Sequence, residues 1–93
     1  MKRLSRQQKE FLLGELVGER VRIAFAADKG LVGLEGKIAD ETMNTLVLHT
    51  EKGLRRVPKN SCKFAFPDAG IEIEGAVLAH RPHERTKKLG QKL

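Results

Sequence analysis

Apolar and polar residues alternate through the middle of the chain, most clearly between residues 31 and 59. The apolar side of the first strand in this stretch consists of Val32, Leu34, Gly36 and Ile38. A period of two is typical of a half-buried β-strand. Two more strands are predicted over residues 45–50 and 54–57, because turn-forming residues occupy 40–44 and 51–53. Residues 31–59 are therefore expected to form two successive β-hairpins.

The same alternation predicts three further strands, over residues 20–26, 62–66 and 71–79. Their aromatic residues Phe25, Phe64 and Phe66 are expected to point inward. Gly75 lies within the last and longest of these strands, where it indicates a bend or bulge. About six short antiparallel strands favour a small closed barrel, because closure removes the exposed edges of a sheet.

Helical signals lie at the two ends of the chain. Ser5 and Gln8 match a capping box, and the apolar residues that follow predict a helix over about residues 6–13. Pro82 can begin a second helix. We therefore predict one mostly β domain over residues 1–93, with a barrel core over 20–79. An N-terminal helix or arm covers 1–19 and a C-terminal helix or tail covers 80–93, and both can be disordered in the isolated protein.

The positive charge is concentrated at the ends of the chain. The formal net charge of +6 divides into +2 for residues 1–20, zero for 21–79 and +4 for 80–93. Such ends are expected to bind a polyanion, with nucleic acid ahead of an anionic membrane. No apolar run reaches the roughly 18 residues that a membrane span needs, and no signal peptide is predicted.

No group of residues has the pattern of a catalytic or metal site. Glu72 and Glu74 share a strand face but alternate with isoleucines, which is typical of a solvated face. His80, His83 and Cys62 lack the further soft ligand that a structural zinc site needs. Because Cys62 is the only cysteine, no intramolecular disulfide can form, and a reducing cytoplasmic location is expected.

Arginine and lysine side chains are the best candidates for function, as donors to the phosphates of a folded RNA. Stacking on bases is not expected, because the chain has no Trp or Tyr and the strand phenylalanines fit the inward pattern. Asp40, Thr42 and Asn44 are expected to shape a hairpin turn rather than to act in catalysis. The predicted RNA contacts are Arg3, Arg6, Lys37, Arg55, Arg56, Lys59, Arg81, Arg85, Lys87 and Lys88.

Several segments together resemble one known family. They are GLEGKIADETMNTL at residues 33–46, RVPK at 56–59, FAF at 64–66, Gly75 and RPHER at 81–85. In this order they are similar to archaeal ribonuclease P protein component 1 over roughly residues 10–88. The family pattern near the end is closer to R-P-E-x-R, whereas here His83 precedes Glu84.

The resemblance implies an Sm-like barrel that serves as a non-catalytic, RNA-binding subunit of ribonuclease P, which cleaves the 5′ leader from precursor tRNA. It implies that the RNA performs the chemistry, with Mg²⁺ expected on the RNA subunit and no cofactor bound by this chain. The implied partners are ribonuclease P RNA and a small zinc-containing protein subunit, with precursor tRNA as an indirect partner. Two alternatives remain open, namely an Sm-like RNA- or protein-interaction module such as a ring former, and a stand-alone nuclease.

Overall fold

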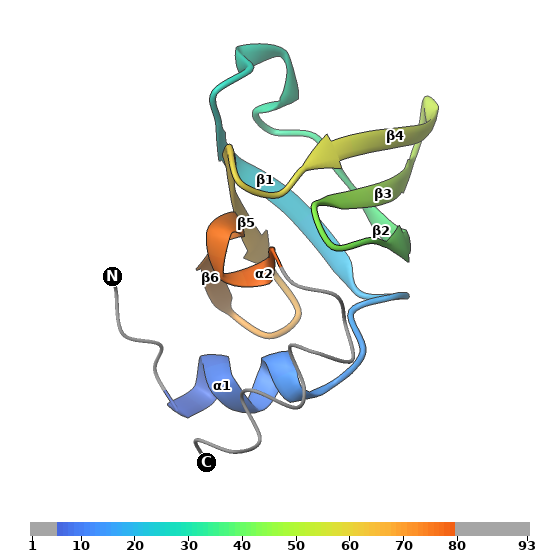
Figure 1. The fold of residues 1–93 in the computed structure, drawn as a ribbon. Helices are drawn as coiled ribbons and strands as arrows, with labels where there is room; N and C mark the ends of the chain where they lie inside the picture. The colour runs from blue at the N-terminus through green and yellow to red at the C-terminus, as the bar shows by residue number, and fades with distance from the viewer. Residues whose placement is uncertain (1–5, 80–93) are drawn as a thin grey trace.

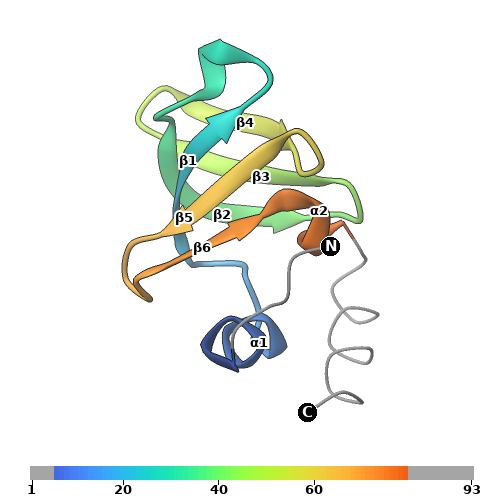
Figure 2. The same cartoon turned by 90° about the vertical axis from the view of Figure 1, so that its left-hand side faces the viewer.

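The computed structural model describes residues 6–79. Six antiparallel strands form one sheet in the order β4-β3-β2-β1-β5-β6, and the sheet curves around the core with α1 beside one end (Figures 1 and 2). The elements are α1 (Arg6–Leu13), β1 (Arg20–Ala26), the 3₁₀ helix η1 (Lys29–Leu31), β2 (Glu35–Glu41), β3 (Thr45–Thr50), β4 (Gly53–Pro58), β5 (Cys62–Phe66), β6 (Ile71–Glu74) and α2 (Gly75–Leu78).

The mostly β fold with six antiparallel strands is confirmed, but the sheet is not closed into a barrel. β4 and β6 are its two edges, and within residues 6–79 they do not pair with each other. The predicted strand over 71–79 is wrong beyond residue 74, because the chain turns there into α2. α2 instead lies across the opening of the curved sheet (Figure 2).

Close packing at Gly75 explains why the last strand stops where it does. A Cβ atom at this position would lie 1.6 Å from the carbonyl oxygen of Lys59 and 2.7 Å from that of Cys62. The glycine therefore lets the backbone of α2 pack directly against the segment that begins β5. The predicted bend is present, but it leads into a helix rather than along a strand.

A bulge in β1 exposes an aromatic ring that the alternation predicts to be buried. The register between β1 and β5 shifts between Ile23 and Phe25. One extra residue moves the following side chains to the opposite face, so Ala26 is buried and the Phe25 side chain is 62% exposed. The inward prediction is thus wrong for Phe25, while it is confirmed for Phe64 and Phe66, which are at most 1% exposed.

The core contains apolar side chains from all six strands and both helices. Its most deeply buried members are Leu12, Leu16, Val21, Ile23, Ile38, Leu46, Leu48, Val57, Phe64, Phe66, Ile73 and Leu78. Burial of a Leu, Ile or Phe side chain contributes about 1.5–3 kcal/mol to the folded state. The apolar sides of the strands, set by the alternation in the sequence, therefore supply most of the stabilisation.

The predicted helix over residues 6–13 is confirmed and is docked on the end of the sheet. The ring of Phe11 packs on that of Phe66 at a centroid distance of 4.7 Å. Gln7 donates through Nε2 to the carbonyl oxygen of Ala69 at 3.2 Å, and Gln8 donates to that of Glu72 at 2.6 Å. An isolated helix of eight residues is marginal in water, so these contacts account for its formation.

The β2–β3 turn is shorter than predicted, because β2 continues through Glu41 after a bulge between Ile38 and Asp40. Thr42 shapes the turn through its hydroxyl oxygen, which lies 2.6 Å from that of Thr45 and accepts from the Thr45 N–H at 3.1 Å. Asp40 accepts from the N–H of Glu41 at 2.8 Å. The carbonyl oxygen of Asn44 accepts from the backbone N–H of Lys59, the residue that follows β4, at 2.8 Å.

Cys62 begins β5 with its side chain turned into the core, where it is 6% exposed. Burial raises the pKa of this thiol above its ordinary value. We expect the native protein to react with iodoacetamide at pH 8 much more slowly than the protein unfolded in guanidinium chloride, since only the thiolate reacts. Mass spectrometry over a time course measures both rates. Equal rates in the two states would contradict the burial of Cys62.

Candidate nucleic-acid interface

Three polar or charged side chains and one exposed leucine form a row across the outer face of the sheet, which is the face opposite the core. The register aligns Arg20 of β1 with Lys37 of β2, Lys37 with His49 of β3, and His49 with Leu54 of β4. Directly opposed residues of antiparallel strands lie on the same face, and all four are exposed. Residues from four strands therefore come together on one surface.

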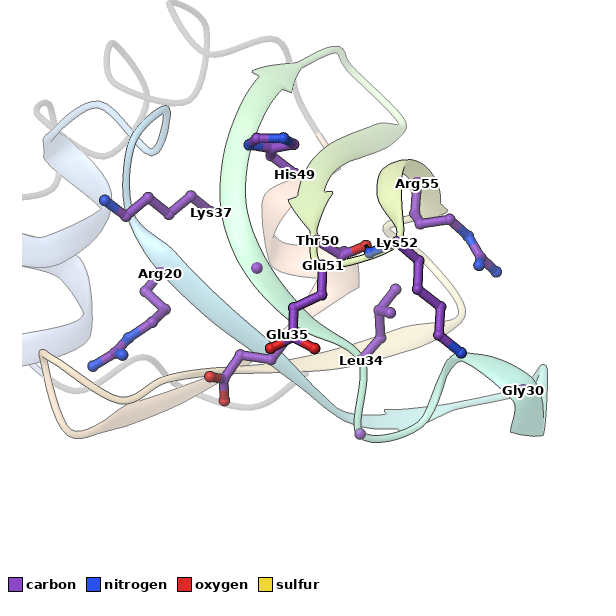
Figure 3. A pocket seen from close by; sticks show the side chains of 12 residues that line it. Arg20, Gly30, Leu34, Glu35, Lys37, His49, Thr50, Glu51, Lys52 and Arg55 are labelled. Atoms are coloured by element: carbon purple, nitrogen blue, oxygen red, sulfur yellow. Dashed lines mark hydrogen bonds between the residues drawn. The ribbon is translucent and has the colours of Figure 1, made fainter.

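This row borders an open hollow of about 620 Å³, called the outer hollow below (Figure 3). Its walls come from the segment between η1 and β2, from β2 itself and from the β3–β4 hairpin. The charged or titratable side chains that line it are Arg20, Glu35, Lys37, His49, Glu51, Lys52 and Arg55. Basic groups thus outnumber carboxylates around the hollow.

Gly36 holds β2 close to β3 beneath the outer hollow. A Cβ atom at Gly36 would lie 2.5 Å from the carbonyl oxygen of His49 and 3.2 Å from Cγ2 of Thr50. Real Cβ atoms do not approach a carbonyl oxygen so closely, so a side chain at this position would push the two strands apart. The absence of a side chain at Gly36 keeps Lys37 and His49 on one continuous surface.

The cations around the outer hollow differ in their partners. Arg20 donates through Nη2 to Oδ1 of Asp68 at 2.8 Å, and this hydrogen bond raises the pKa of Arg20 above its ordinary value. Within the described residues, no carboxylate lies within 4.0 Å of the charged nitrogens of Lys37, Lys52 or Arg55. These three groups are therefore available to an external anion.

The structure brings together only part of the predicted RNA-contact set. Lys37 and Arg55 line the outer hollow, and Arg56 is exposed next to Arg55 on β4. Arg6 is exposed on α1, where Nε lies 3.6 Å from Oε1 of Glu10. Five further predicted contacts lie outside the described residues: Arg3, Arg81, Arg85, Lys87 and Lys88.

The structure corrects the prediction for Lys59, whose side chain is fully buried. Its Nζ atom donates to Oε2 of Glu41 at 2.8 Å, to the carbonyl oxygen of Thr42 at 2.6 Å and to that of Leu78 at 2.7 Å. These contacts, called the Lys59 clamp below, join the end of β2 and the β2–β3 turn to α2. Lys59 therefore holds the open side of the sheet together and is not available to bind RNA.

Arg20, Lys52 and His49 are members of the hollow that the sequence prediction missed. Arg20 precedes the buried Val21, so the alternation already places its side chain on the outer face. Lys52 lies at the tip of the predicted β3–β4 turn. The local pattern can thus indicate that each of these side chains is exposed. It cannot show that they lie beside Lys37, because their proximity depends on the pairing of distant strands.

The described part of the chain contains neither a cluster of metal ligands nor a helix that could span a membrane. Between residues 6 and 79, no three His, Cys, Asp or Glu side chains come together as metal ligands would. None of the helices in this range has the length and apolar character required to cross a membrane.

Comparison with known proteins agrees with the resemblance seen in the sequence. Residues 9–88 match the model of the family described as ribonuclease P/MRP, subunit p29. A ribonuclease P protein component 1 from Methanocaldococcus jannaschii is 43% identical over 77 residues, which cover 80% of this chain and 81% of that protein. The protein of the same name from Methanothermobacter thermautotrophicus is 41% identical over 78 residues, covering 80% of this chain and 84% of the relative.

A solved structure supports the same conclusion. It is described as Mth11, a homologue of the human RNase P protein Rpp29, and it superposes on this chain with a TM-score of 0.55 at 38% sequence identity. The match covers 77% of this chain and 97% of the other. The chain therefore belongs to the ribonuclease P/MRP subunit p29 family, the family of archaeal ribonuclease P protein component 1.

Proposed function

We propose that this chain is a non-catalytic subunit of ribonuclease P that binds the RNA of that ribonucleoprotein through the outer hollow and the basic ends of the chain. The observation that carries the proposal is the placement of Lys37, Lys52 and Arg55, three cations without an ion-pair partner among the described residues, around one exposed hollow. Membership of the p29 family supports ribonuclease P RNA as the partner.

The arrangement suits contact with phosphate groups. Arginine and lysine bind phosphate oxygens without reading the base sequence, and they fix the position of a protein on a folded RNA. If about five phosphates are neutralised, the logarithm of the binding constant should fall with the logarithm of salt concentration at a slope near −4.

The proposal extends to the rest of the complex. It includes a small zinc-containing protein subunit as a neighbour, precursor tRNA as an indirect partner, and Mg²⁺ on the RNA rather than on this chain. It also places the protein in the cytoplasm, where the lone buried thiol of Cys62 stays reduced. In this view the protein supplies counter-charge and shape to an RNA that performs the cleavage.

Replacing Lys37 and Arg55 together by alanine is expected to weaken binding to ribonuclease P RNA about tenfold near physiological salt. The salt slope should become shallower by about two, since each lost phosphate contact removes about one unit. Fluorescence anisotropy with labelled RNA at several salt concentrations measures both quantities.

The matched control replaces Arg22 and Lys63 by alanine. It removes the same charge from an exposed residue of β1 and a half-buried residue of β5, neither of which lines the hollow. This control variant should retain most of the RNA affinity. If the two double variants lose affinity equally, the outer hollow has no special role and the contact is diffuse.

A further inference from the structure

We propose that the outer hollow recognises ribonucleotides as such, with its cations holding phosphates while Glu35 and Glu51 accept hydrogen bonds from 2′-hydroxyl groups. The inference rests on the proposed function and deepens it, because it assigns a role to the two carboxylates of a site that otherwise only attracts anions. A surface that bound RNA through charge attraction alone would gain nothing from carboxylates at that place.

The two carboxylates line the hollow together with its basic side chains. Glu35 begins β2, and Glu51 lies in the turn between β3 and β4. Figure 3 shows both side chains between Arg20 and Lys37 on one side and Lys52 and Arg55 on the other. An RNA segment held by cations from both sides would therefore pass directly over these two acceptors.

The opposite charges of the hollow do not neutralise one another. Within residues 6–79, neither Glu35 nor Glu51 has a charged nitrogen within 4.0 Å, although both share the hollow with lysine and arginine side chains. Arg20 takes Asp68 as its partner at 2.8 Å, and Glu35 is the smallest contributor to its raised pKa. Donors and acceptors thus remain separate, and both kinds are available to one ligand.

RNA is the polyanion that can satisfy both kinds of group. Its phosphates accept from lysine and arginine, while its 2′-hydroxyls, which DNA lacks, donate. A hydrogen bond from such a donor to a carboxylate is charge-assisted and stronger than one between neutral groups. A polyanion without donors would meet only repulsion at Glu35 and Glu51, so the same residues would discriminate against it.

The test replaces Glu35 and Glu51 by glutamine, singly and together, and measures binding to ribonuclease P RNA and to DNA of the same sequence. Although each change makes the protein more positive, we expect RNA affinity to fall about fivefold for each, because a charge-assisted hydrogen bond becomes a neutral one. DNA affinity should fall less, or rise. Thermal unfolding should be unchanged, because both side chains are exposed.

The control replaces Glu15 and Glu72, exposed acids outside the hollow, by glutamine. This variant should bind RNA as well as the wild type or more tightly. RNA affinity that stays equal or rises in E35Q/E51Q would overturn the inference, because the carboxylates would then only repel.

The alanine variant of Lys37 and Arg55 separates this inference from the proposed function. If that variant loses affinity while E35Q/E51Q does not, only the role of the carboxylates fails. If neither variant loses affinity, the hollow is not an RNA surface, and both proposals fail.

Discussion

Replacing Lys59 by methionine is expected to destabilise the protein by about 3–5 kcal/mol, because it leaves the buried carboxylate of Glu41 without its cation. The Lys59 and Glu41 side chains are 0% and 2% exposed, and their Nζ and Oε2 atoms lie 2.8 Å apart. The same change removes the donor to the carbonyl oxygens of Thr42 and Leu78. Since domains have total stabilities of about 5–15 kcal/mol, the loss is a large fraction of the whole.

Chemical unfolding in urea, followed by circular dichroism, measures the effect. The control is Lys63→Met, which removes a surface ion pair whose Nζ and Oε1 atoms lie 3.4 Å apart and whose side chains are 39% and 53% exposed. That change should cost less than about 1 kcal/mol.

A second variant tests whether the buried charge itself causes the loss. Adding Glu41→Gln to Lys59→Met should restore part of the stability, because no unpaired charge then remains in the interior. A stability for Lys59→Met within about 1 kcal/mol of the wild type would contradict the Lys59 clamp.

Replacing Gly75 by alanine is expected to destabilise the protein by about 3 kcal/mol or more. The added Cβ would lie 1.6 Å from the carbonyl oxygen of Lys59, which is backbone and cannot move aside as a flexible side chain can. α2 would have to shift, and Leu78, which is fully buried and carries one acceptor of the Lys59 clamp, would shift with it. Thermal or urea unfolding measures the change.

Gly14→Ala is the matched control for this substitution. At Gly14 the nearest atom to an added Cβ is the carbonyl oxygen of Phe11, at an ordinary contact distance of 3.5 Å. Its φ is not positive, so alanine there should change stability by less than about 1 kcal/mol in either direction. Similar unfolding midpoints for Gly14→Ala and Gly75→Ala would show that α2 tolerates displacement.

Local patterns were sufficient to predict most of the fold. The period of two predicts all six strands, although β2 begins at Glu35 and the predicted strand residue Val32 lies before it and is exposed. The capping box with its apolar stripe predicts the helix over Arg6–Leu13. Each of these signals depends on residues within a few positions of one another. Even the inward orientation of Phe64 and Phe66 follows from alternation within β5.

The errors arise where a contact between distant segments decides the outcome. The bulge after Ile23 depends on how β1 pairs with β5, and it exposes Phe25. The burial of Lys59 depends on α2 and the β2–β3 turn meeting across the open side of the sheet. A lysine after an edge strand is normally solvated, so no local feature distinguishes this one.

The sequence predicted that the candidate site would contain exposed basic residues, but not which residues would lie together there. The charge of Lys37 and Arg55 and their expected exposure indicated RNA contact, and both line the outer hollow. Their proximity to Arg20 and Lys52 follows from the strand register, which alternation alone does not determine. The sequence pattern does not single out Glu35 and Glu51, because the role proposed for their carboxylates depends on the cations around them.

The docking of α1 has a consequence for self-association. Polymers and rings of small β-proteins grow when a free strand at one border of a subunit pairs with a free strand of the next. Here the side-chain amides of Gln7 and Gln8 already donate to the main-chain carbonyls of Ala69, in the β5–β6 turn, and of Glu72, in β6. A β4 strand of another copy that paired with β6 at Glu72 would compete with Gln8 for this carbonyl, so the docked N-terminal helix disfavours head-to-tail assembly through this edge.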